Sequence, residues 1–298
     1  MQRVLLLLAL AGAALLGLLA RLDAGPGLDS ARPGDLDGLR LASWNLENWF
    51  DKYDDPYRRD EVTKPAYVNE ARQKRCAAVL RELNADVVAL QEVENRFLLQ
   101  EFVDTHLSDM GYQVVLVEGN DSRGIDCALL SKLPIRAVTS YQHRQFPGAD
   151  GMMQHFRRDL LRVSLGAPFD GDVYVVHLKS QFGDEEADIV REAESAEILR
   201  IFGENGLSNP DYRAVVIGDF NEVPELPTIT QLIAGGLIDP MQGTKKYSYN
   251  QEPYLTRIDF ALMTRALAGE VESADILDEL GEHRLEACSD HYPLLVSF

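Results

Sequence analysis

Cysteine is scarce in this chain, and its cysteines are poorly placed for disulfide bonds. There are three, Cys76, Cys127 and Cys288, an odd number at wide spacings. Small secreted domains that depend on disulfides carry closely spaced pairs instead. We predict that Cys76 and Cys127, which lie in apolar-periodic segments, are small core residues, and a bridge that involves Cys288 is disfavoured. The fold must rest on an apolar core, for which a hydrophobic fraction of 46% is ample.

Basic residues are also few. The chain has 29 Lys and Arg against 48 Asp and Glu, which gives a formal net charge of -19. Proteins that hold nucleic acid by covering it with cations are basic overall, because neutralisation of phosphates supplies most of that binding free energy. This composition excludes that class. It still permits a small basic cleft that contacts only a few phosphates.

A long, uncharged apolar run lies at the N-terminus. It covers residues 4–20, is rich in Leu and Ala, and is flanked by arginines. Such a run predicts a signal peptide or an N-terminal membrane anchor over residues 1–24. No small-x-small cleavage site is evident, since Leu18 and Leu22 occupy the upstream positions, so both outcomes stay open. We expect an exported protein that is periplasmic or secreted, or that contacts the membrane through this segment if it is not cleaved.

The composition then changes twice. Residues 25–38, rich in Gly, Pro, Asp and Leu, predict a flexible tether, and residues 39–298 predict the folded domain. Strand-like apolar runs are found at 39–44, 87–90, 113–118, 127–131, 160–165, 173–178, 214–218, 257–263 and 294–298. Helical periodicity is found at 68–83, 95–108, 184–202 and 228–234. Without an internal repeat or a second linker, this alternation predicts one α/β domain with two sheets or one large one.

Polar side chains gather at six ends of the predicted strands. The segments are 43–48, 91–94, 177–180, 218–221, 257–260 and 289–291. A sheet holds the backbone at such a point while the adjoining loop exposes the side chain, which is a common arrangement in enzyme sites. Each segment alone has a structural explanation, as a turn, a helix start or a buried strand histidine. Together they combine oxygen ligands with proton carriers and predict metal-assisted hydrolysis.

The ordered motifs Gly-Asp-Phe-Asn at 218–221, Arg-Ile-Asp at 257–259 and Ser-Asp-His at 289–291 resemble those of the endonuclease/exonuclease/phosphatase superfamily, the deoxyribonuclease I-like enzymes. The resemblance covers essentially everything after the tether. It implies an α/β fold, a four-layer sandwich of two packed mixed β-sheets flanked by helices, which agrees with the strands counted above. It also implies a hydrolase that acts on phosphate ester bonds. We expect a monomer.

The resemblance further implies a divalent cation in the site. Glu92 and Asn45 would hold it, and Asp290 would contribute further. Carboxylate and amide oxygens suit Mg²⁺, the cation that we expect, and Mn²⁺ or Ca²⁺ stay open as alternatives. The cation would neutralise charge that develops on the phosphate.

Catalytic roles follow from the same resemblance. Asp219 and Asn221 would orient the attacking water and the phosphate. His291, held by Asp259, would bind or protonate the phosphoryl group, and His177 matches a second histidine near the leaving oxygen. We expect each Asp–His pairing to favour imidazolium and to raise the pKa of the histidine.

Three further residues are candidates around this set. Arg123, in the loop at 119–126, is predicted to contact substrate phosphate. Lys179 is a second candidate for that contact, because a residue two positions after His177 lies on the same face of a continuing strand. Both cations have an alternative as ordinary solvated side chains. Asp126 is a candidate to orient His177.

The resemblance leaves the substrate open, since the superfamily includes enzymes for nucleic acids, sphingomyelin-like lipids and inositol phosphates. An inositol phosphatase is disfavoured, because residues 252–256 lack the Trp-Thr-Asp arrangement of those enzymes. A phospholipase needs an exposed apolar or aromatic loop to enter the bilayer interface. Tyr247, Tyr249 and Tyr254 offer one, but polar residues surround them.

A nuclease fits best. It needs scattered basic residues, and the chain offers Arg144, Arg157, Arg158, Lys245 and Lys246. Segments 48–51 and 119–126 also resemble exported bacterial nucleases. We predict a metal-dependent endonuclease that cleaves DNA or RNA by in-line attack of an activated water, with a sphingomyelinase-like phospholipase or a phosphomonoesterase as alternatives. A non-catalytic binding module is disfavoured, because all the assigned ligand and catalytic residues are present.

Overall fold

The computed structural model describes residues 34–53, 57, 67–181 and 184–298. The predicted signal peptide or anchor lies outside the described residues, as does most of the predicted tether. Residues Asp35–Phe298 form one compact unit. Leu36 is already buried in its core, so packing begins before the predicted domain start at residue 39. No helix in the described ranges is long and apolar enough to cross a membrane.

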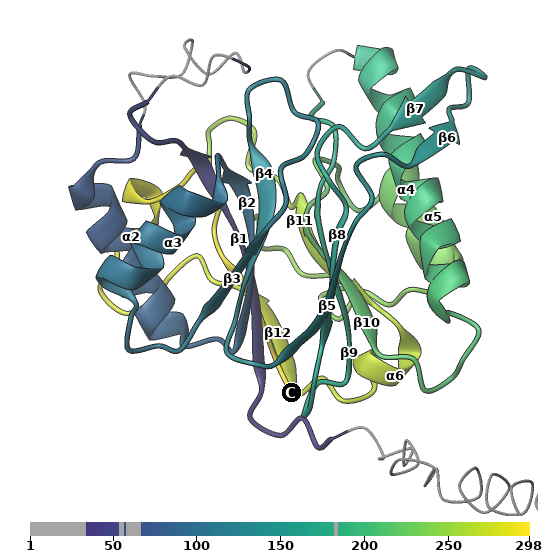
Figure 1. The fold of residues 1–298 in the computed structure, drawn as a ribbon. Coiled ribbons are helices and arrows are strands. Elements are labelled where there is room, and N and C mark those ends of the chain that lie inside the picture. The colour runs from purple at the N-terminus through teal and green to yellow at the C-terminus, as the bar shows by residue number, and fades with distance from the viewer. Residues whose placement is uncertain (1–33, 54–56, 58–66, 182–183) are drawn as a thin grey trace, which may run out of the picture. The chain divides into compact units, whose positions relative to one another are not determined.

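Two mixed β-sheets form the centre of this unit (Figure 1). The first sheet has six strands, in the order β12 (Ser273–Ile276), β13 (Leu294–Ser297), β1 (Arg40–Trp49), β2 (Val87–Val93), β4 (Asp126–Ser131) and β3 (Gln113–Leu116). The second sheet has five, in the order β11 (Asp259–Met263), β10 (Ala214–Asp219), β9 (Gly171–His177), β8 (Leu161–Leu165) and β5 (Ile135–Ser140). A separate hairpin pairs β6 (Gln145–Pro147) with β7 (Met153–His155).

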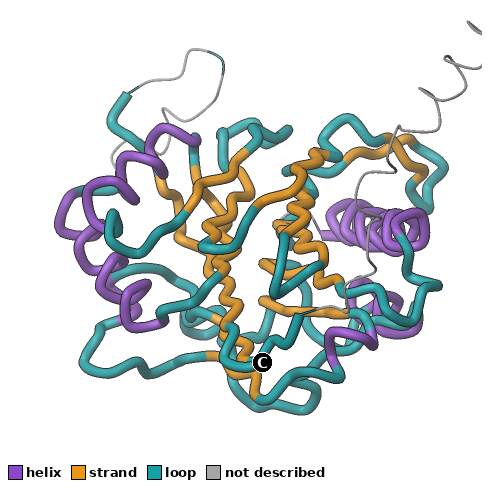
Figure 2. Tube along the Cα trace, turned by 60° about the horizontal axis from the view of Figure 1, so that its bottom comes forward, coloured by secondary structure: helices purple, strands orange, loops and turns teal. Residues whose placement is uncertain are grey.

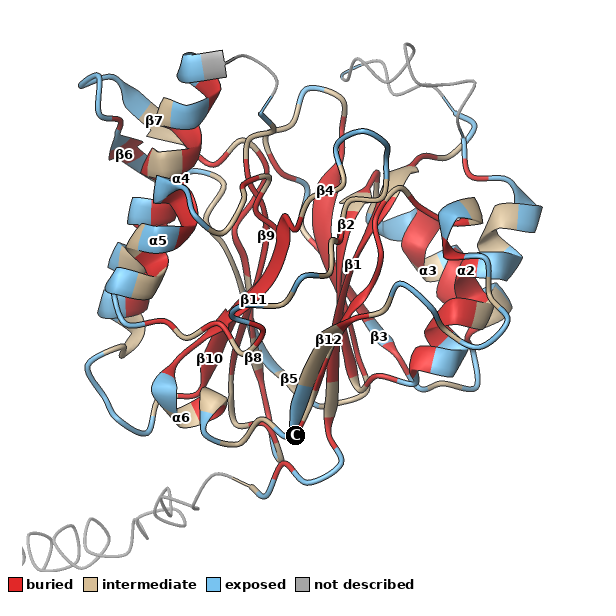
Figure 3. Cartoon of the chain, turned by 180° about the vertical axis from the view of Figure 1, so that it is seen from behind, coloured by how far each residue is buried: buried red, intermediate tan, exposed pale blue. Residues whose placement is uncertain are grey.

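Helices cover the outer faces of both sheets (Figures 1 and 2). The first sheet is covered by α2 (Glu70–Leu83) and α3 (Arg96–His106), and the second by α4 (Asp184–Asn205) and α5 (Pro227–Ala234). Their buried faces turn toward the sheets, as Figure 3 shows. Two short elements, α6 (Arg265–Ala268) and η3 (Leu285–Ala287), complete the unit. The four layers are helix, sheet, sheet and helix, which confirms the predicted sandwich.

Strand β9 shows why the central strands are apolar throughout. Val173 and Val175 belong to the cluster that packs between the two sheets, whereas Tyr174 and Val176 pack with side chains from α4 and α5. Successive side chains of a strand point to opposite faces, and both faces of this strand are covered. It therefore lacks the polar alternation of a half-exposed strand.

Parallel pairing brings the polar strand ends to one edge. β1 pairs in parallel with β2, and β9 pairs in parallel with β10. In the second sheet Asp219 stands in register between His177 on β9 and Asp259 on β11. In the first sheet Asn45 is in register with Gln91. Because β1 also packs against β10, these two sets of polar residues meet.

The close approach of β9 and β10 requires Gly218. Its φ is 143°, and a Cβ at this position would lie 2.1 Å from the carbonyl oxygen of Val176. Only glycine adopts this conformation readily and leaves that space free. The spacing between His177 and Asp219 therefore depends on the missing side chain.

The two ends of the unit meet at the start of β1. Arg40 is in register with Ser297 of β13. The N–H of Gly38 donates to the carbonyl oxygen of Phe298 (2.7 Å), and the N–H of Phe298 donates to that of Leu39 (3.0 Å). The first and last residues of the unit are thus tied into the same sheet.

The main differences from the predicted elements are at the sheet edges. The sequence does not predict β5 and β12, which are edge strands with mostly exposed or half-buried side chains and so lack an apolar period. It also misses the short strands of the hairpin. β1 continues past the predicted end at residue 44 to Trp49, with Leu46 and Trp49 buried.

Candidate active site

A cleft of about 320 Å³ opens where the polar strand ends meet. Side chains from both sheets and from the adjoining loops form its walls. The predicted site residues that line it are Glu92, Arg123, His177, Asp219, Asn221, Asp290 and His291. Asn45 and Asp259 are buried and contact residues of the cleft wall. Of the predicted site residues, Lys179 alone is absent from both groups.

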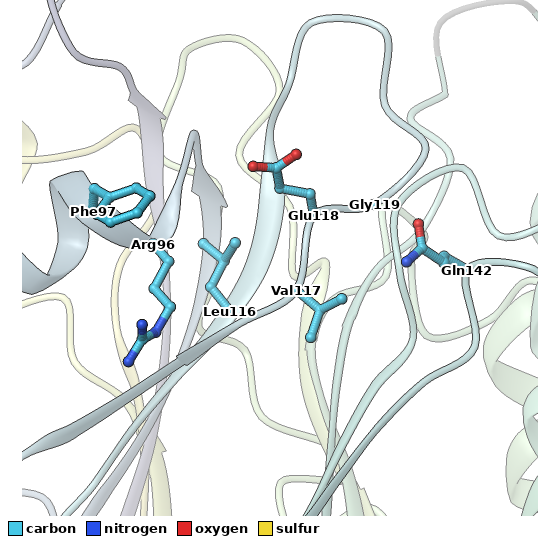
Figure 4. A pocket seen from close by; sticks show the side chains of 7 residues that line it. All are labelled: Arg96, Phe97, Leu116, Val117, Glu118, Gly119 and Gln142. Carbon is cyan, nitrogen blue, oxygen red and sulfur yellow. The ribbon is translucent and has the colours of Figure 1, made fainter.

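A second depression, of about 450 Å³, lies beside the start of α3 (Figure 4). Its lining residues are Arg96, Phe97, Leu116, Val117, Glu118, Gly119 and Gln142. It offers one carboxylate and no histidine, so it has no acid–base pair. The candidate chemistry belongs to the smaller cleft.

His291 is held in one orientation. Its Nδ1 lies 2.8 Å from Oδ2 of Asp259, its carbonyl oxygen accepts from Nε1 of Trp44 (2.9 Å), and its N–H donates to Oγ of Ser289 (3.0 Å). Burial alone would lower the pKa of His291, but the neighbouring carboxylates, Asp259 above all, raise it to about 10. The residue is therefore an imidazolium, with Nε2 lying 3.8 Å from Oδ2 of Asp219.

His177 differs from its prediction. Its Nε2 lies 3.5 Å from Asp219 Oδ2 and 3.9 Å from Glu92 Oε1, while its Nδ1 has no hydrogen-bond partner among the described residues. Asp126, the residue predicted to orient it, accepts a hydrogen bond from the N–H of Gly119 (2.6 Å). Burial, followed by nearby positive charges, lowers the pKa of His177 well below its ordinary value. The expected imidazolium is wrong here, because burial and the neighbouring positive charges disfavour the protonated form.

Asp219 lies at the centre of the cleft. Its Oδ2 accepts from Nδ2 of Asn45 (3.1 Å), and its Oδ1 accepts from the N–H of Asn221 (2.8 Å). Asn221 has a φ of 52°, and its side chain donates to the carbonyl oxygen of Leu178 (3.1 Å). Burial, together with the charge of Asp259, raises the pKa of Asp219 to about 7. A carboxyl group that titrates near neutrality can accept a proton from a bound water.

Acidic side chains of the first sheet face the same cleft. Oε2 of Glu92 accepts from the N–H of Asn48 (2.7 Å), and Oε2 of Glu47 accepts from the N–H of Asp290 (3.2 Å). Burial raises the pKa of Asp290 to about 6, and the negative charges of Glu47 and Glu92 contribute to the rise. These carboxylates therefore repel one another.

This donor set fits a hard divalent cation. The described residues contain no preformed group of three or more His, Cys, Asp or Glu side chains around one point. Glu92 and Asp290 nevertheless offer carboxylate oxygens, and Asn45 adds an amide oxygen that already accepts from the N–H of Glu47 (2.9 Å). A bound cation would relieve the repulsion that raises the pKa of Asp290.

Two guanidinium groups also line the cleft. Arg158 is buried, with Nη1 donating to the carbonyl oxygen of Leu178 (3.0 Å) and Nε lying 2.9 Å from Oδ2 of Asp121. Oδ1 of Asp121 accepts from the N–H of Arg123 (2.8 Å), and Nη1 of Arg123 donates to Oδ1 of Asn48 (3.3 Å). The sequence names Arg158 only as one scattered basic residue, because its burial beside the cleft is a product of the fold.

Lys179 is placed differently. β9 ends at His177, so the alternation that would put Lys179 on the same face does not continue. Its ammonium group donates to the carbonyl oxygen of Ser180 (3.0 Å), and its backbone N–H donates to Oε2 of Glu194 (2.9 Å). It does not appear among the residues that line the cleft.

A model of the Endonuclease/Exonuclease/phosphatase family matches residues 40–257. The chain belongs to this family. Membership confirms the resemblance carried by the motifs and places the chain among phosphoester hydrolases. No curated protein matches the sequence.

Several solved structures share the fold of this chain. An AP endonuclease from Archaeoglobus fulgidus is 17% identical, with a TM-score of 0.61 over 87% of this chain and 99% of that one. A 3′ phosphatase from Neisseria, bound to a product DNA hairpin, is 16% identical, with a TM-score of 0.58 over 88% and 99%. A mannosyl-6-phosphatase from Bacteroides thetaiotaomicron is 17% identical, with a TM-score of 0.62 over 87% and 99%. At such identities the likeness establishes the fold alone.

One residue that the sequence does not single out joins β1 to the segment before the Ser-Asp-His motif. Arg72 lies on α2, and its Nη2 donates to the carbonyl oxygens of Leu46 (2.6 Å) and Glu47 (2.8 Å). Its Nε donates to the carbonyl oxygen of Cys288 (2.8 Å). A side chain of α2 therefore holds the end of β1 and the segment before the Ser-Asp-His motif together. In the sequence Arg72 looks no different from Arg75, which belongs to the same basic stretch.

Proposed function

We propose that the chain is an exported, divalent-metal-dependent nuclease that hydrolyses phosphodiester bonds of DNA or RNA. The observation that carries this is a near-neutral carboxyl group and a supported imidazolium, Asp219 and His291, in one cleft. Arg123 and Arg158 add two anion-binding groups to the same cleft. A base, an acid and fixed cations suit in-line attack of water on a phosphodiester.

Asp219 would take the proton from the attacking water. Asn45 and the N–H of Asn221 hydrogen-bond its two oxygens, so the carboxylate keeps one orientation as the proton moves. With a pKa of about 7, a large part of Asp219 is deprotonated near neutral pH and can act as a general base.

The two histidines would serve the phosphate in different ways. His291 keeps its positive charge and can donate from Nε2 to a phosphoryl oxygen or give its proton to the leaving oxygen. His177 stays neutral, so it can hydrogen-bond to the phosphate without adding charge to the site.

Glu92, Asn45 and Asp290 would hold the cation, which we propose to be Mg²⁺. When bound, it supplies charge neutralisation on the phosphate. Without it, the carboxylates of Glu92, Asp290 and Glu47 would repel an anionic substrate from this side of the cleft. The acid-rich half of the site therefore suits phosphate chemistry only together with a cation.

Exposed aromatic and cationic side chains favour a nucleic-acid chain over a small phosphate ester. Tyr254 lines the cleft and is 69% exposed, and Phe97, beside Arg96 in the second depression, is 85% exposed (Figure 4). Nucleobases stack on exposed rings, while cations contact their phosphates. Exposed Tyr254 is also the observation that keeps a phospholipase as the second candidate.

A panel of substrates tests the proposal. The full-length chain is incubated with plasmid DNA, RNA, sphingomyelin and p-nitrophenyl phosphate, with Mg²⁺, Mn²⁺ or Ca²⁺ and with chelator. We expect cation-dependent cleavage of DNA or RNA. Hydrolysis of the lipid or the monoester without nucleic-acid cleavage would contradict a nuclease, and full activity in chelator would contradict the cation.

Export is tested separately. Its support is the apolar run at residues 4–20. A C-terminally tagged chain, expressed in a Gram-negative host, is expected in the periplasm, the medium or the membrane fraction after cell fractionation. Recovery in the cytoplasm alone would contradict export without touching the catalytic proposal.

A further inference from the structure

Two thiols lie against each other directly behind the Ser-Asp-His motif. Cys76 is on α2 and Cys288 follows η3, and the two are 212 positions apart in the sequence. Sγ of Cys76 lies 4.0 Å from the carbonyl oxygen of Cys288, and the thiol of Cys288 donates to the carbonyl oxygen of Arg284 (3.8 Å). Both residues are buried. The third cysteine, Cys127, is on β4 and is also buried.

The elements that carry this pair are already held together. α2 packs against η3. Nε of Arg72 donates to the carbonyl oxygen of Cys288 (2.8 Å), and Nε of Arg75 donates to that of Ala287 (3.3 Å). A disulfide forms only where the backbone keeps two cysteines close and correctly directed. Here two guanidinium groups, both from the turn of α2 that precedes Cys76, keep the facing backbone in place.

We propose that Cys76 and Cys288 form a disulfide that ties α2 to the segment carrying the Ser-Asp-His motif. Wide spacing in the sequence hides the pair, because the fold alone brings its two members together. The inference goes beyond the proposed function and does not depend on the substrate.

The oxidant is a small disulfide such as oxidised glutathione. The thiolate of Cys288, whose neighbours Arg284 and Glu286 are exposed, attacks one glutathione sulfur and displaces the other as a thiolate. The thiolate of Cys76 then attacks the sulfur of Cys288 and displaces the second glutathione. The protein gives up two protons and two electrons, and the oxidant becomes two molecules of reduced glutathione. Because both thiols are buried, the exchange takes place during folding or when the η3 segment opens.

The new bond would reinforce a chain of contacts into the site. Oγ of Ser289, the residue after Cys288, donates to the carbonyl oxygen of Asn45 (2.6 Å). A link at Cys288 therefore holds the cation-binding end of β1 as well as the Ser-Asp-His segment. Because it closes a very long loop, it also restricts the unfolded chain and raises thermal stability.

Thiol mapping tests the proposal. The full-length chain is equilibrated with oxidised glutathione, alkylated under denaturing conditions and digested. We expect two of the three thiols to be lost, with the peptides of Cys76 and Cys288 joined and Cys127 alkylated. The matched control Cys127→Ser should keep the joined peptides, and Cys76→Ser should lose them.

Melting curves give a second readout. Reductant should lower the Tm of the wild type and of Cys127→Ser by several degrees and leave that of Cys76→Ser unchanged. If Cys76→Ser does not fold, the peptide map and the effect of reductant on Cys127→Ser still show whether the disulfide forms. Retention of all three thiols, or a link that includes Cys127, would overturn the proposal. Neither readout uses catalytic activity, so failure here leaves the proposed function untouched.

Discussion

The two sheets contribute unlike halves to one cleft. In the second sheet, the side chains of Asp219 and Asp259 are 2% and 3% exposed, and each lies against a histidine. In the first sheet, the side chains of Glu92 and Asp290 are 15% and 26% exposed, and each lies 3.9 Å from a histidine and close to other carboxylates. The buried half is fixed by contacts within the protein, whereas the more exposed half would be completed by the proposed cation.

His291 connects the halves. Its segment leads into β13 of the first sheet, while its ring contacts Asp259 of the second. The Asp–His pair is therefore formed only when the two sheets are packed together. Alignment of the acid with the base depends on the sandwich itself.

The largest expected effect is in the second-sheet half. Asp219→Asn keeps the shape of the side chain but removes the base, so kcat should fall by about 10²–10⁴-fold. Single-turnover cleavage of the preferred nucleic acid measures it. Asp211→Asn, at an exposed position outside the cleft, is the control. A fall of less than about tenfold would contradict the role of Asp219 as general base.

The first-sheet half should respond through the cation instead. Glu92→Gln removes one charge from the donor set, so the affinity for Mg²⁺ or Mn²⁺ should fall by roughly tenfold or more. Calorimetric titration measures the affinity, and part of the activity should return at high Mg²⁺. Asp219→Asn should change the affinity much less. Equal effects of the two variants on cation affinity would erase the distinction between the halves.

The pH profile sharpens the same comparison. The proposed mechanism needs Asp219 deprotonated and His291 protonated, so kcat/KM should rise as pH passes through about 7 and fall above about 10. The free energy of unfolding of the cation-free protein should change in the opposite direction in the pH range below about 7, falling while kcat/KM rises. The folded pKa of Asp219 lies above its ordinary value of 3.8. The stability that this carboxyl group contributes is therefore fully present below pH 3.8 and is lost as pH rises through about 7. Denaturant unfolding at several pH values should show this window in the wild type and lose it in Asp219→Asn.

A smaller effect is expected for Arg72, which supports the first-sheet half of the site from α2. Arg72→Lys keeps the charge but cannot reach all three carbonyl oxygens, so stability should fall by about 1–3 kcal/mol. The kcat should fall with little change in KM, because Arg72 positions the motifs and does not touch substrate. Arg75→Lys is the matched control, since Arg75 is exposed and its Nε donates to a single carbonyl oxygen. Similar losses in both variants would argue against the role of Arg72.

The smallest effect is expected at Lys179. Lys179→Ala should leave KM for the nucleic acid almost unchanged, because its ammonium group donates to the carbonyl oxygen of Ser180 and Lys179 itself does not line the cleft. Arg123→Ala, which removes a cation from the cleft, should raise KM by roughly tenfold. Steady-state kinetics at fixed ionic strength compares the two. A larger effect at Lys179 than at Arg123 would restore Lys179 as the phosphate contact.

The sequence predicts the buried strands and the motifs at their ends, because both are short-range patterns. β9 and β10 are apolar throughout since both of their faces are covered, and that run is visible without a structure. In the structure, parallel pairing of the strands brings Asn45 and Glu92 to one edge and places Asp219 beside His177.

What the sequence does not predict depends on distant packing. The protonation state of His177 follows from burial, which no local pattern reveals. Arg72, Arg158 and the Cys76–Cys288 contact each join segments far apart in the chain. Edge strands such as β5 are not predicted, because only one of their flanks is paired and their side chains are largely exposed.

The pairing of the unit's two ends has a practical consequence for engineering. Gly38 and Phe298 are hydrogen-bonded at the start of β1, about 16 Å along the strand from Asn45 near its middle. A reporter or affinity domain fused after Phe298 would join the unit at the end of the sheet away from the cleft. The same proximity makes the unit a candidate for circular permutation, with a short linker across the old ends and new ends opened in a surface loop.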